Sequence, residues 1–399
     1  MQKVFILVLI ILQSVNLLIA QPNNKIDFLT EIPASPFTSE NYTDKNITKM
    51  PVLDDLTIEM RLSELNFQTP ISLDFNDHVK KYIHYLLTQR KDVINRSLSY
   101  AGYYFPIFET YLDKYHLPME LKYLSVVESG LNPFARSKSG AVGLWQFLLP
   151  TAQLLNLKIN SFIDERQDPI KSTEAACSYL EYLYNMFNDW QLAIAAYNGG
   201  PSVVKNAMIR SGKNTFWEIR PYLSQETQNY VPAFIAMVYL MNYAKEYQLQ
   251  PSENMVYYHQ IDTVLVNKPI YFQKLSQILN INIETIRFLN PVYKQDYIPK
   301  MPTNVPLVLP SDKISAFIEH KNEIYNNDFP DPNQLNSNNT KKAISYTVKK
   351  GDYLTKLAID FRCSPEDIKK WNNLKSNDLT TGSSLTIWTP TTNNSIIIE

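Results

Sequence analysis

Apolar residues recur with helical spacing through most of the chain between residues 76 and 247. The clearest run places Val79, Tyr82, Ile83 and Leu86 at positions i, i+3, i+4 and i+7, on one face of a helix. Similar spacing predicts further helices along this region, at residues 93–104, 106–115, 119–128, 143–157, 168–187, 192–197 and 226–247. The helix over 143–157 should be broken or kinked at Pro150. We therefore expect a helical domain over residues 71–250 and a fold class that is mainly α.

The pattern changes after Pro251, where short strand-like and helical segments alternate. Residues 256–310 and 343–389 each predict a small βααβ module, with a strand at either end and two short helices between. The two copies align so that Asn290 stands where Asn372 stands, but the first copy lacks the Gly-Asp turn of the second. We interpret residues 256–310 as a degenerate copy and residues 311–342 as a linker.

The N-terminal end has the character of a targeting segment followed by a spacer. Residues 1–20 are largely apolar and predict a secretory signal peptide, with an uncleaved membrane anchor and a buried first helix as alternatives. Polar residues from Gln13 to Asn16 shorten the apolar run and favour the signal peptide. Residues 21–70 are rich in Pro, Asn, Thr and Ser, so we interpret them as a spacer, with a helix near residues 53–65 that docks on the core.

The overall composition gives no sign of a nucleic-acid or metal partner. The chain has 399 residues, enough for two or three domains of about 150 residues each. Hydrophobic residues make up 45% and charged residues 19%, as in ordinary globular proteins, and the net charge of -1 gives no indication of a nucleic-acid partner. Cys177 and Cys363 fall in different predicted domains, and no metal-ligand spacing is present. We therefore expect no metal, no cofactor and no nucleic acid.

One acidic residue stands out against the apolar helical pattern. Glu128 follows Leu121 and Leu124 on one helical face, and Gly130 can cap that helix in a left-handed conformation. Alternatives are a glutamate turned to water at a frayed helix end, or a buried ion pair. Partial burial and the negative end of the helix dipole would both raise the pKa of the Glu128 carboxyl. A carboxylic acid that keeps its proton near neutral pH can act as a general acid on a glycosidic oxygen.

The chain after Glu128 lacks a nearby partner carboxylate. No Asp or Glu occurs between Ser129 and Ile163, whereas ordinary glycosidases place two carboxylates around the scissile bond. A second carboxylate could come from elsewhere, and Glu226 is the first candidate, although its place at a predicted helix start also fits a stabilising role. The other solution is assistance by an N-acetyl group of the substrate, which indicates a polymer of N-acetylhexosamine.

Four blocks of residues occur in order along the helical region. They are Glu128-Ser129, the run from Ser137 to Phe147, the run from Ala195 to Gly200, and Glu226-Thr227 with Tyr230-Val231-Pro232. Together these blocks resemble the SLT family of lytic transglycosylases over about residues 112–243. Tyr346-Thr347-Val348 and Trp371-Asn372 make residues 343–389 resemble the LysM module, which binds peptidoglycan glycan, and residues 256–310 resemble it less closely.

The resemblance implies a lysozyme-like catalytic domain that cleaves the β-1,4 bond between N-acetylmuramic acid and N-acetylglucosamine without water, leaving 1,6-anhydro ends. It makes Glu128 the catalytic acid and base, and the residues that it implies for substrate binding are Ser137, Gln146, Tyr197, Asn198 and Tyr230. It further implies an exported, periplasmic protein that acts on peptidoglycan strands without a cofactor. Membrane association depends on the alternative of an uncleaved N-terminal segment, and no Cys near the end of that segment supports a lipid anchor. We expect a monomer.

Alternatives remain for single residues and for the function. Tyr197 also fits a core aromatic residue with a satisfied hydroxyl, and Ser137 fits a loop hydroxyl bonded to its own backbone. A hydrolase resembling goose-type lysozymes would cleave the same bond with a second carboxylate. A non-catalytic peptidoglycan-binding scaffold is the remaining alternative, and it predicts that Glu128→Gln changes neither cleavage nor binding.

Overall fold

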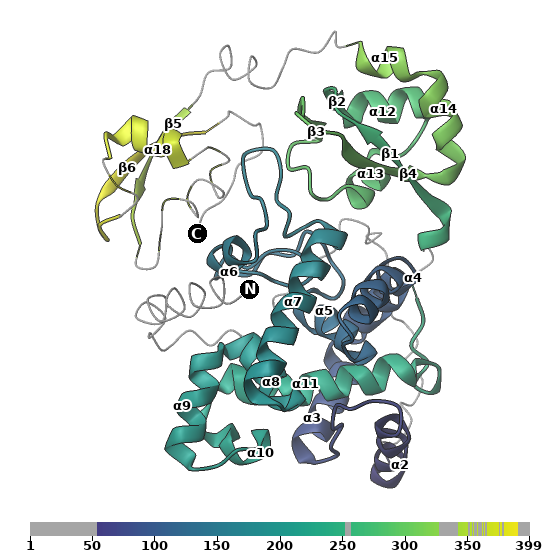
Figure 1. Cartoon of the computed structure of the whole chain (residues 1–399), viewed down its shortest axis with the longest axis vertical. Coiled ribbons are helices and arrows are strands. Elements are labelled where there is room, and N and C mark those ends of the chain that lie inside the picture. The colour runs from purple at the N-terminus through teal and green to yellow at the C-terminus, as the bar shows by residue number, and fades with distance from the viewer. Residues whose placement is uncertain are drawn as a thin grey trace. The chain divides into compact units, whose positions relative to one another are not determined.

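The computed structural model describes residues 54–251 and 257–326 and, with short gaps between residues 350 and 378, residues 342–389. The predicted signal peptide and the spacer before residue 54 lie outside these ranges. Every helix within them is too short or too polar to cross a membrane. The described chain divides into two compact units: residues 54–131 and 173–251 form the first, and residues 132–172 with both C-terminal modules form the second (Figure 1).

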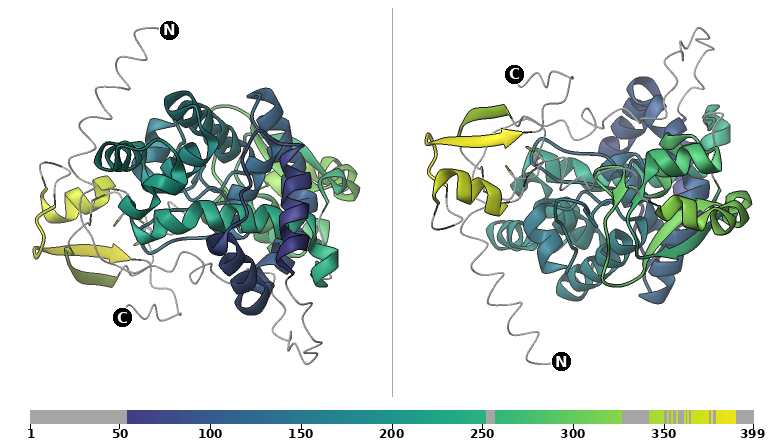
Figure 2. Two further views of the ribbon diagram at one scale, coloured as in Figure 1. Left: turned by 90° about the horizontal axis from the view of Figure 1, so that it is seen from below. Right: turned by 90° about the horizontal axis from the view of Figure 1, so that it is seen from above.

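All regular elements of the first unit are helices. They are α2 (Asp55–Asn66), α3 (Asp77–Gln89), α4 (Lys91–Lys114), η1 (Met119–Leu121), α5 (Lys122–Ser129), most of α7 (Pro169–Phe187), α8 (Trp190–Gly199), α9 (Pro201–Ser211), α10 (Phe216–Ile219), η2 (Arg220–Tyr222), α11 (Gln225–Asn242) and η3 (Ala244–Tyr247). Every side chain of α11 from Tyr230 to Leu240 is buried, so α11 is the central helix of the unit. It packs against α3, α5 and α8, which Figures 1 and 2 show from three directions.

Glycine and capping residues fix the helix ends near the candidate site. α5 ends at Gly130, whose φ of 58° is left-handed, and this confirms the predicted C-cap. α8 begins after Asp189, whose side chain accepts a hydrogen bond from the Leu192 amide. Gly200, with a φ of 86°, separates α8 from α9, which opens with Pro201 at its first position. The ends of α5 and α8 are therefore specified locally by the sequence.

Two predictions about the first helices are settled by the structure. The predicted helix near residues 53–65 is confirmed as α2, with Ile58 and Leu62 buried. The separate helices predicted over 93–104 and 106–115 are wrong, because both ranges belong to the single helix α4. Pro106 removes one backbone donor from α4, but the buried face continues through Tyr104 and Phe108, and this burial outweighs the lost hydrogen bond.

The second unit begins with the segment 132–172, which contains the short helix α6 (Leu149–Leu154) and the start of α7. The longer helix predicted over residues 143–157 is wrong at its start, since Gly143 and Gln146 have φ values of 89° and 49°. An α-helix does not contain such residues, so the chain from Gly143 to Leu148 runs as a turn and loop.

The first C-terminal module joins a strand pair to several short helices. β1 (Ile261–Val266) pairs antiparallel with β4 (Val305–Pro310), from Ile261 opposite Pro310 to Val266 opposite Val305. The remaining elements are η4 (Tyr258–Gln260), β2 (Ile270–Tyr271), α12 (Phe272–Leu279), α13 (Ile283–Leu289), β3 (Tyr297–Ile298), η5 (Ser311–Lys313), α14 (Ile314–Glu319) and α15 (Lys321–Tyr325). Our linker boundary at residue 311 is too early, because Phe317 of α14 and Ile324 of α15 are buried in the core of this module.

The second module contains β5 (Lys342–Thr347), α18 (Pro365–Asn372) and β6 (Ser384–Thr389), with the strands antiparallel (Figure 2). Asn372 donates to the Thr386 carbonyl and accepts from the Thr386 amide, at 2.8 and 2.7 Å. Asn290 makes the same pair of bonds to Val308 in the first module, both at 2.8 Å. In both modules an asparagine at the end of a helix ties that helix to the last strand, and this supports the predicted alignment of the two copies.

Candidate active site

Glu128 and Tyr230 form the centre of the candidate site, on α5 and α11 of the first unit. The Tyr230 hydroxyl donates a hydrogen bond to Oε1 of Glu128 at 2.5 Å, although the two residues are 102 positions apart in the chain. Tyr230 is fully buried, whereas Glu128 keeps partial access to solvent. The carboxyl is therefore anchored by a buried phenol and remains partly accessible to solvent.

Burial sets the charge state of Glu128. Loss of solvent around the carboxyl and, to a smaller extent, the negative charge of Glu226 raise the pKa, which stands at about 8 instead of 4.5. The hydrogen bond from Tyr230 stabilises the carboxylate and so lowers the pKa, but by less than burial raises it. The result is a carboxylic acid that holds its proton at neutral pH, which is the state that a general acid needs.

Tyr197, near the end of α8, is close enough to Glu128 for the charge of that carboxyl to affect the pKa of its phenol. Burial raises the pKa of its phenol well above the ordinary value, and the charge of Glu128 is the next cause. The pKa of the Tyr230 phenol is raised for the same two reasons, with burial again first. The ring of Tyr197 packs against that of Tyr179, with 5.6 Å between the ring centroids. Both phenols therefore stay neutral and add no negative charge around Glu128.

A polar cluster joins the end of α8 to the first turn of α11. Asn198 Nδ2 donates to Glu226 Oε1 at 3.2 Å, and Thr227 Oγ1 donates to Asn198 Oδ1 at 2.9 Å. Gly199 allows the two helix ends to approach, because a Cβ there would lie 2.6 Å from Thr227 Oγ1. Among the described residues, no three His, Cys, Asp or Glu side chains are grouped so that they could hold a metal ion. The hydrogen bonds of Asn198 and Thr227 thus hold the carboxylate of Glu226 in place.

Ser137 lies in the second unit, on the segment that follows α5 in the chain. Its hydroxyl oxygen accepts a hydrogen bond from the Ala141 amide at 3.0 Å and lies 2.9 Å from Ser139 Oγ. These contacts match the alternative of a loop hydroxyl bonded to its own backbone. In this structure Ser137 therefore orders the turn that contains it.

Gln146 lies on the same segment of the second unit and also bonds to it. Nε2 of Gln146 donates to the Ala135 and Gly143 carbonyls, at 3.2 and 2.8 Å. Both amide hydrogens of Gln146 are therefore used within the segment, and its amide oxygen can still accept a hydrogen bond. The neighbouring Trp145 is fully buried and belongs to the core.

The sequence predicts Tyr230 as a substrate-binding residue but does not reveal its direct bond to Glu128. The signal in the sequence is the spacing of Glu226 and Tyr230, which are four residues apart and so share one face of α11. Thr227 was missed because its partner, Asn198, is 29 positions away in the chain. Contacts of this kind follow from the tertiary fold, which local spacing does not encode.

Comparison with known proteins agrees with the predicted resemblance. Residues 105–220 match the family model described as the Transglycosylase SLT domain. Residues 260–326 match the model for the LysM-like domain of the lytic transglycosylase MltD, and residues 346–388 match the LysM domain. The chain therefore carries an SLT transglycosylase domain followed by two modules of the LysM type. The predicted fold class, a mainly α, lysozyme-like domain followed by small βααβ modules, is confirmed.

Two curated relatives from different strains of Escherichia coli are each named Membrane-bound lytic murein transglycosylase D. Each is 30% identical to this chain over 291 residues, which cover 69% of this chain and 61% of the relative. The chain thus spans about three-fifths of the length of these relatives. Among solved structures, the 70 kDa soluble lytic transglycosylase of Escherichia coli is similar at 24% identity and a TM-score of 0.31. That similarity covers 37% of this chain and 25% of the other.

Proposed function

We propose that this protein is a peptidoglycan lytic transglycosylase. It cleaves the β-1,4 bond between N-acetylmuramic acid and N-acetylglucosamine and leaves 1,6-anhydro-muramyl ends. The observation that carries the proposal is the Glu128 carboxyl, which keeps its proton at neutral pH and has a phenol as its hydrogen-bonded partner. The relatives named as lytic murein transglycosylases support the same reaction.

One carboxyl is enough for both proton transfers in this reaction. Glu128 first gives its proton to the bridging oxygen as the bond to the anomeric carbon breaks, and the muramyl N-acetyl group stabilises the positive charge that develops there. The Glu128 carboxylate then takes the proton of the 6-hydroxyl of the same sugar while O6 bonds to the anomeric carbon. Atoms and charges balance without water, and Glu128 returns to its protonated state. Tyr230 stabilises the carboxylate between the two transfers by its hydrogen bond.

The proposed substrate-binding residues rest on the resemblance of their sequence motifs and on the chemistry of their side chains. Tyr197 and Asn198 stand at the end of α8, in the same unit as Glu128, and Tyr230 holds the carboxyl. Ser137 and Gln146 would meet the N-acetyl and hydroxyl groups of the sugars, the latter through its amide oxygen. A substrate sugar would replace the local bond that Ser137 makes to Ser139.

The LysM-type modules explain how such an enzyme stays on an insoluble substrate. A weak glycan-binding module that is tethered to a catalytic domain raises the local concentration of enzyme on the polymer. We therefore assign glycan binding to residues 342–389. The substrate places the protein in the periplasm or cell envelope. The apolar residues 1–20 would direct export and could hold the chain at the membrane, and we expect it to act as a monomer.

Digestion of purified sacculi by the intact enzyme and by the Glu128→Gln variant tests the proposal. The variant keeps an acceptor for Tyr230 but cannot donate a proton to the glycosidic oxygen. We expect the intact enzyme to release soluble muropeptides and the variant to release them at least about 1,000-fold more slowly. Mass spectrometry of the supernatant measures both rates. Equal release by both proteins would contradict the catalytic role of Glu128, and no release by either would support the non-catalytic scaffold.

A further inference from the structure

A buried ion pair organises the segment that carries Ser137 and Gln146. The side chains of Arg166 and Asp164 are 1% and 0% exposed, and the guanidinium meets the carboxylate with two bonds, Nε to Oδ1 at 2.9 Å and Nη2 to Oδ2 at 2.7 Å. The third guanidinium nitrogen of Arg166 bonds to the backbone of the loop. Its Nη1 donates to the carbonyl oxygens of Gly140 and Phe147, both at 3.3 Å. These two carbonyls lie on either side of the turn at Gly143, so one guanidinium holds both strands of the loop.

The backbone of the loop packs on the same anchor. A Cβ at Gly143 would lie 1.9 Å from the Arg166 carbonyl oxygen, so the turn rests directly on the backbone of Arg166. Gln167 Nε2 donates to the Pro133 carbonyl at 3.3 Å and ties the start of the segment to the same place. Residues 133–147, which we call the substrate segment, are therefore positioned by Asp164, Arg166 and Gln167.

The stretch that contains Asp164 and Arg166 is in turn bonded to the first C-terminal module. The Asp164 amide donates to the Val292 carbonyl at 2.9 Å, and the Lys294 amide donates to the Phe162 carbonyl at 2.8 Å. These bonds make a short antiparallel bridge between Ile163 and Tyr293. Lys294 Nζ reinforces it by donating to the Asn160 carbonyl at 3.0 Å. The module thus supplies a strand-like partner for residues 160–164.

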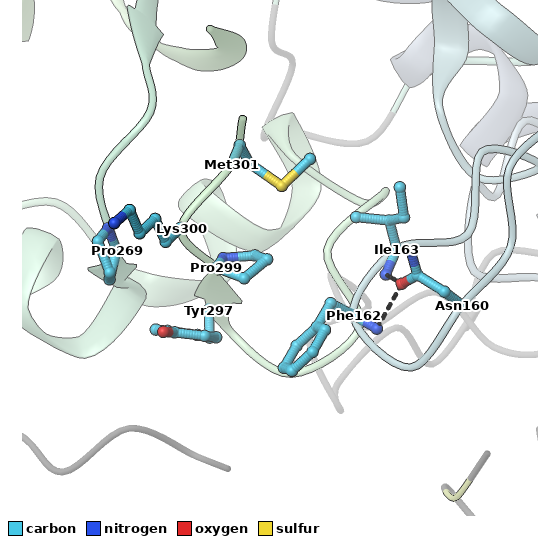
Figure 3. Close-up of a pocket in the computed structure, with 8 residues that line it drawn as sticks. All are labelled: Asn160, Phe162, Ile163, Pro269, Tyr297, Pro299, Lys300 and Met301. Atoms are coloured by element: carbon cyan, nitrogen blue, oxygen red, sulfur yellow. Dashed lines mark hydrogen bonds between the residues drawn. The ribbon is translucent and has the colours of Figure 1, made fainter. Parts of the chain in front are cut away.

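Apolar packing also joins residues 160–164 to the first C-terminal module. Ile163 is 8% exposed and belongs to the hydrophobic core of the module, and Phe162 packs against that core. The ring of Phe162 lies 6.0 Å from the ring of Tyr297. A hollow of about 400 Å³ remains between Phe162 and Ile163 on one side and Tyr297, Lys300 and Met301 on the other (Figure 3). Because Ile163 and Phe162 contribute to the core of the module, the segment 160–164 folds against the module here.

We infer that the first C-terminal module positions the substrate segment of the catalytic domain, with Asp164 and Arg166 as the positioning residues that connect them. The inference rests on the proposed function, because it assumes that Ser137 and Gln146 meet the sugars. It assigns the module a mechanical role in substrate binding that is independent of any glycan the module itself binds. Loosening the junction should weaken substrate binding while the acid at Glu128 keeps its own surroundings.

The test uses the full chain and short soluble glycan fragments, for which anchoring on sacculi is irrelevant. Phe162→Ser removes apolar packing at the junction, Phe162→Leu restores it, and Asp164→Asn weakens the ion pair. Arg287→Gln is the matched control, because it removes ion pairs to Glu284 and Asp296 within the same module. We expect Phe162→Ser and Asp164→Asn to raise KM by about tenfold with kcat changed by less than about threefold. Phe162→Leu and Arg287→Gln should keep the KM of the unmodified enzyme.

Amide hydrogen exchange provides a readout that does not depend on activity. In Phe162→Ser, the amides of Val142 and Gly143, which bond within the loop, should exchange faster, while those of α11 keep their rates. A lower melting temperature with unchanged KM and unchanged exchange in residues 133–147 would overturn the inference. If the loop amides respond but the unmodified enzyme releases no cleavage product, the positioning role stands and the proposed reaction fails.

Discussion

The Tyr230 hydroxyl donates to Oε1 of Glu128 at 2.5 Å, so the candidate acid is bonded to a neutral phenol from the central helix of its unit. The bond stabilises the carboxylate form, while burial and the charge of Glu226 stabilise the acid form. These opposing effects leave the pKa of Glu128 at about 8. An acid with such a pKa can both release and recover a proton near neutral pH, which a reaction with a single carboxyl requires.

The pH dependence of turnover follows from this balance. Glu128 must be protonated to start the reaction, so kcat/KM should fall as the pH rises through about 8. Tyr230→Phe removes the bond that lowers the pKa, so the fall should move to higher pH, and the rate should drop roughly tenfold or more. Steady-state rates on soluble glycan fragments between pH 5 and about 10 measure both effects. A fall that moves to lower pH in Tyr230→Phe would contradict this assignment.

Glu226→Gln should have the opposite effect on the same profile. Removing the negative charge lowers the pKa of Glu128, so the fall in kcat/KM should move to lower pH while turnover at pH 6 stays within about threefold of the unmodified rate. Loss of turnover at every pH would instead identify Glu226 as a required second carboxylate. That result would favour the hydrolase alternative, in which a base activates water.

The raised pKa of Glu128 also predicts a pH-dependent cost in stability. In the unfolded chain this carboxyl loses its proton near pH 4.5, but in the folded protein it does so only near 8. The folded state therefore binds more protons between these values, and stability falls as the pH rises through that window. Glu128→Gln removes this dependence, so the variant should be more stable by roughly 1–3 kcal/mol at pH 8 and about equal at pH 4. Thermal unfolding at both pH values measures the difference, and a variant that is less stable at pH 8 would contradict the buried acid.

The second module should contribute binding rather than chemistry. Asn372→Ala removes the two bonds to Thr386 that tie α18 to β6, and should destabilise this module by about 1–3 kcal/mol. We expect weaker retention on sacculi in a co-sedimentation assay, with unchanged turnover of short soluble fragments. Reduced turnover of the soluble fragments would show that this module takes part in the reaction itself.

The contact between Gly199 and Thr227 predicts a coupled pair of substitutions. Gly199→Ala would place Cβ 2.6 Å from Thr227 Oγ1 and should cost about 1–3 kcal/mol of folding free energy. Thr227→Ala removes that oxygen, so the double variant should be more stable than the sum of the single effects by about 1 kcal/mol. Denaturant unfolding of the four proteins gives the coupling energy. Simple additivity would mean that the two residues do not touch.

Local signals in the sequence are strong enough to predict much of the fold. The apolar spacing predicts α3 and α7, and Gly130 predicts the end of α5. The errors occur where tertiary contacts override local preference. Pro106 suggests a helix boundary, but α4 continues because its buried face is continuous.

The candidate site is less predictable than the fold. An acid at the end of an apolar helix makes Glu128 a candidate without any structure, since most glutamates are exposed. Its bond to Tyr230 and the cluster of Asn198 with Thr227 depend on how α5, α8 and α11 pack together. The role of Asp164 and Arg166 was hidden for a related reason, because their significance lies in the distant carbonyls that Arg166 holds. The motif blocks therefore identify which residues matter, and the structure identifies how they act on one another.

In the proposed reaction Glu128 alone carries both proton transfers, and no water enters the product. The most direct measurement is the mass of the muropeptides released from sacculi by the intact enzyme in water enriched with heavy oxygen. We predict products with 1,6-anhydro ends, lighter by one water than the hydrolysed form and free of the heavy isotope. Products with a reducing end that carries heavy oxygen would contradict the account and make the protein a hydrolase.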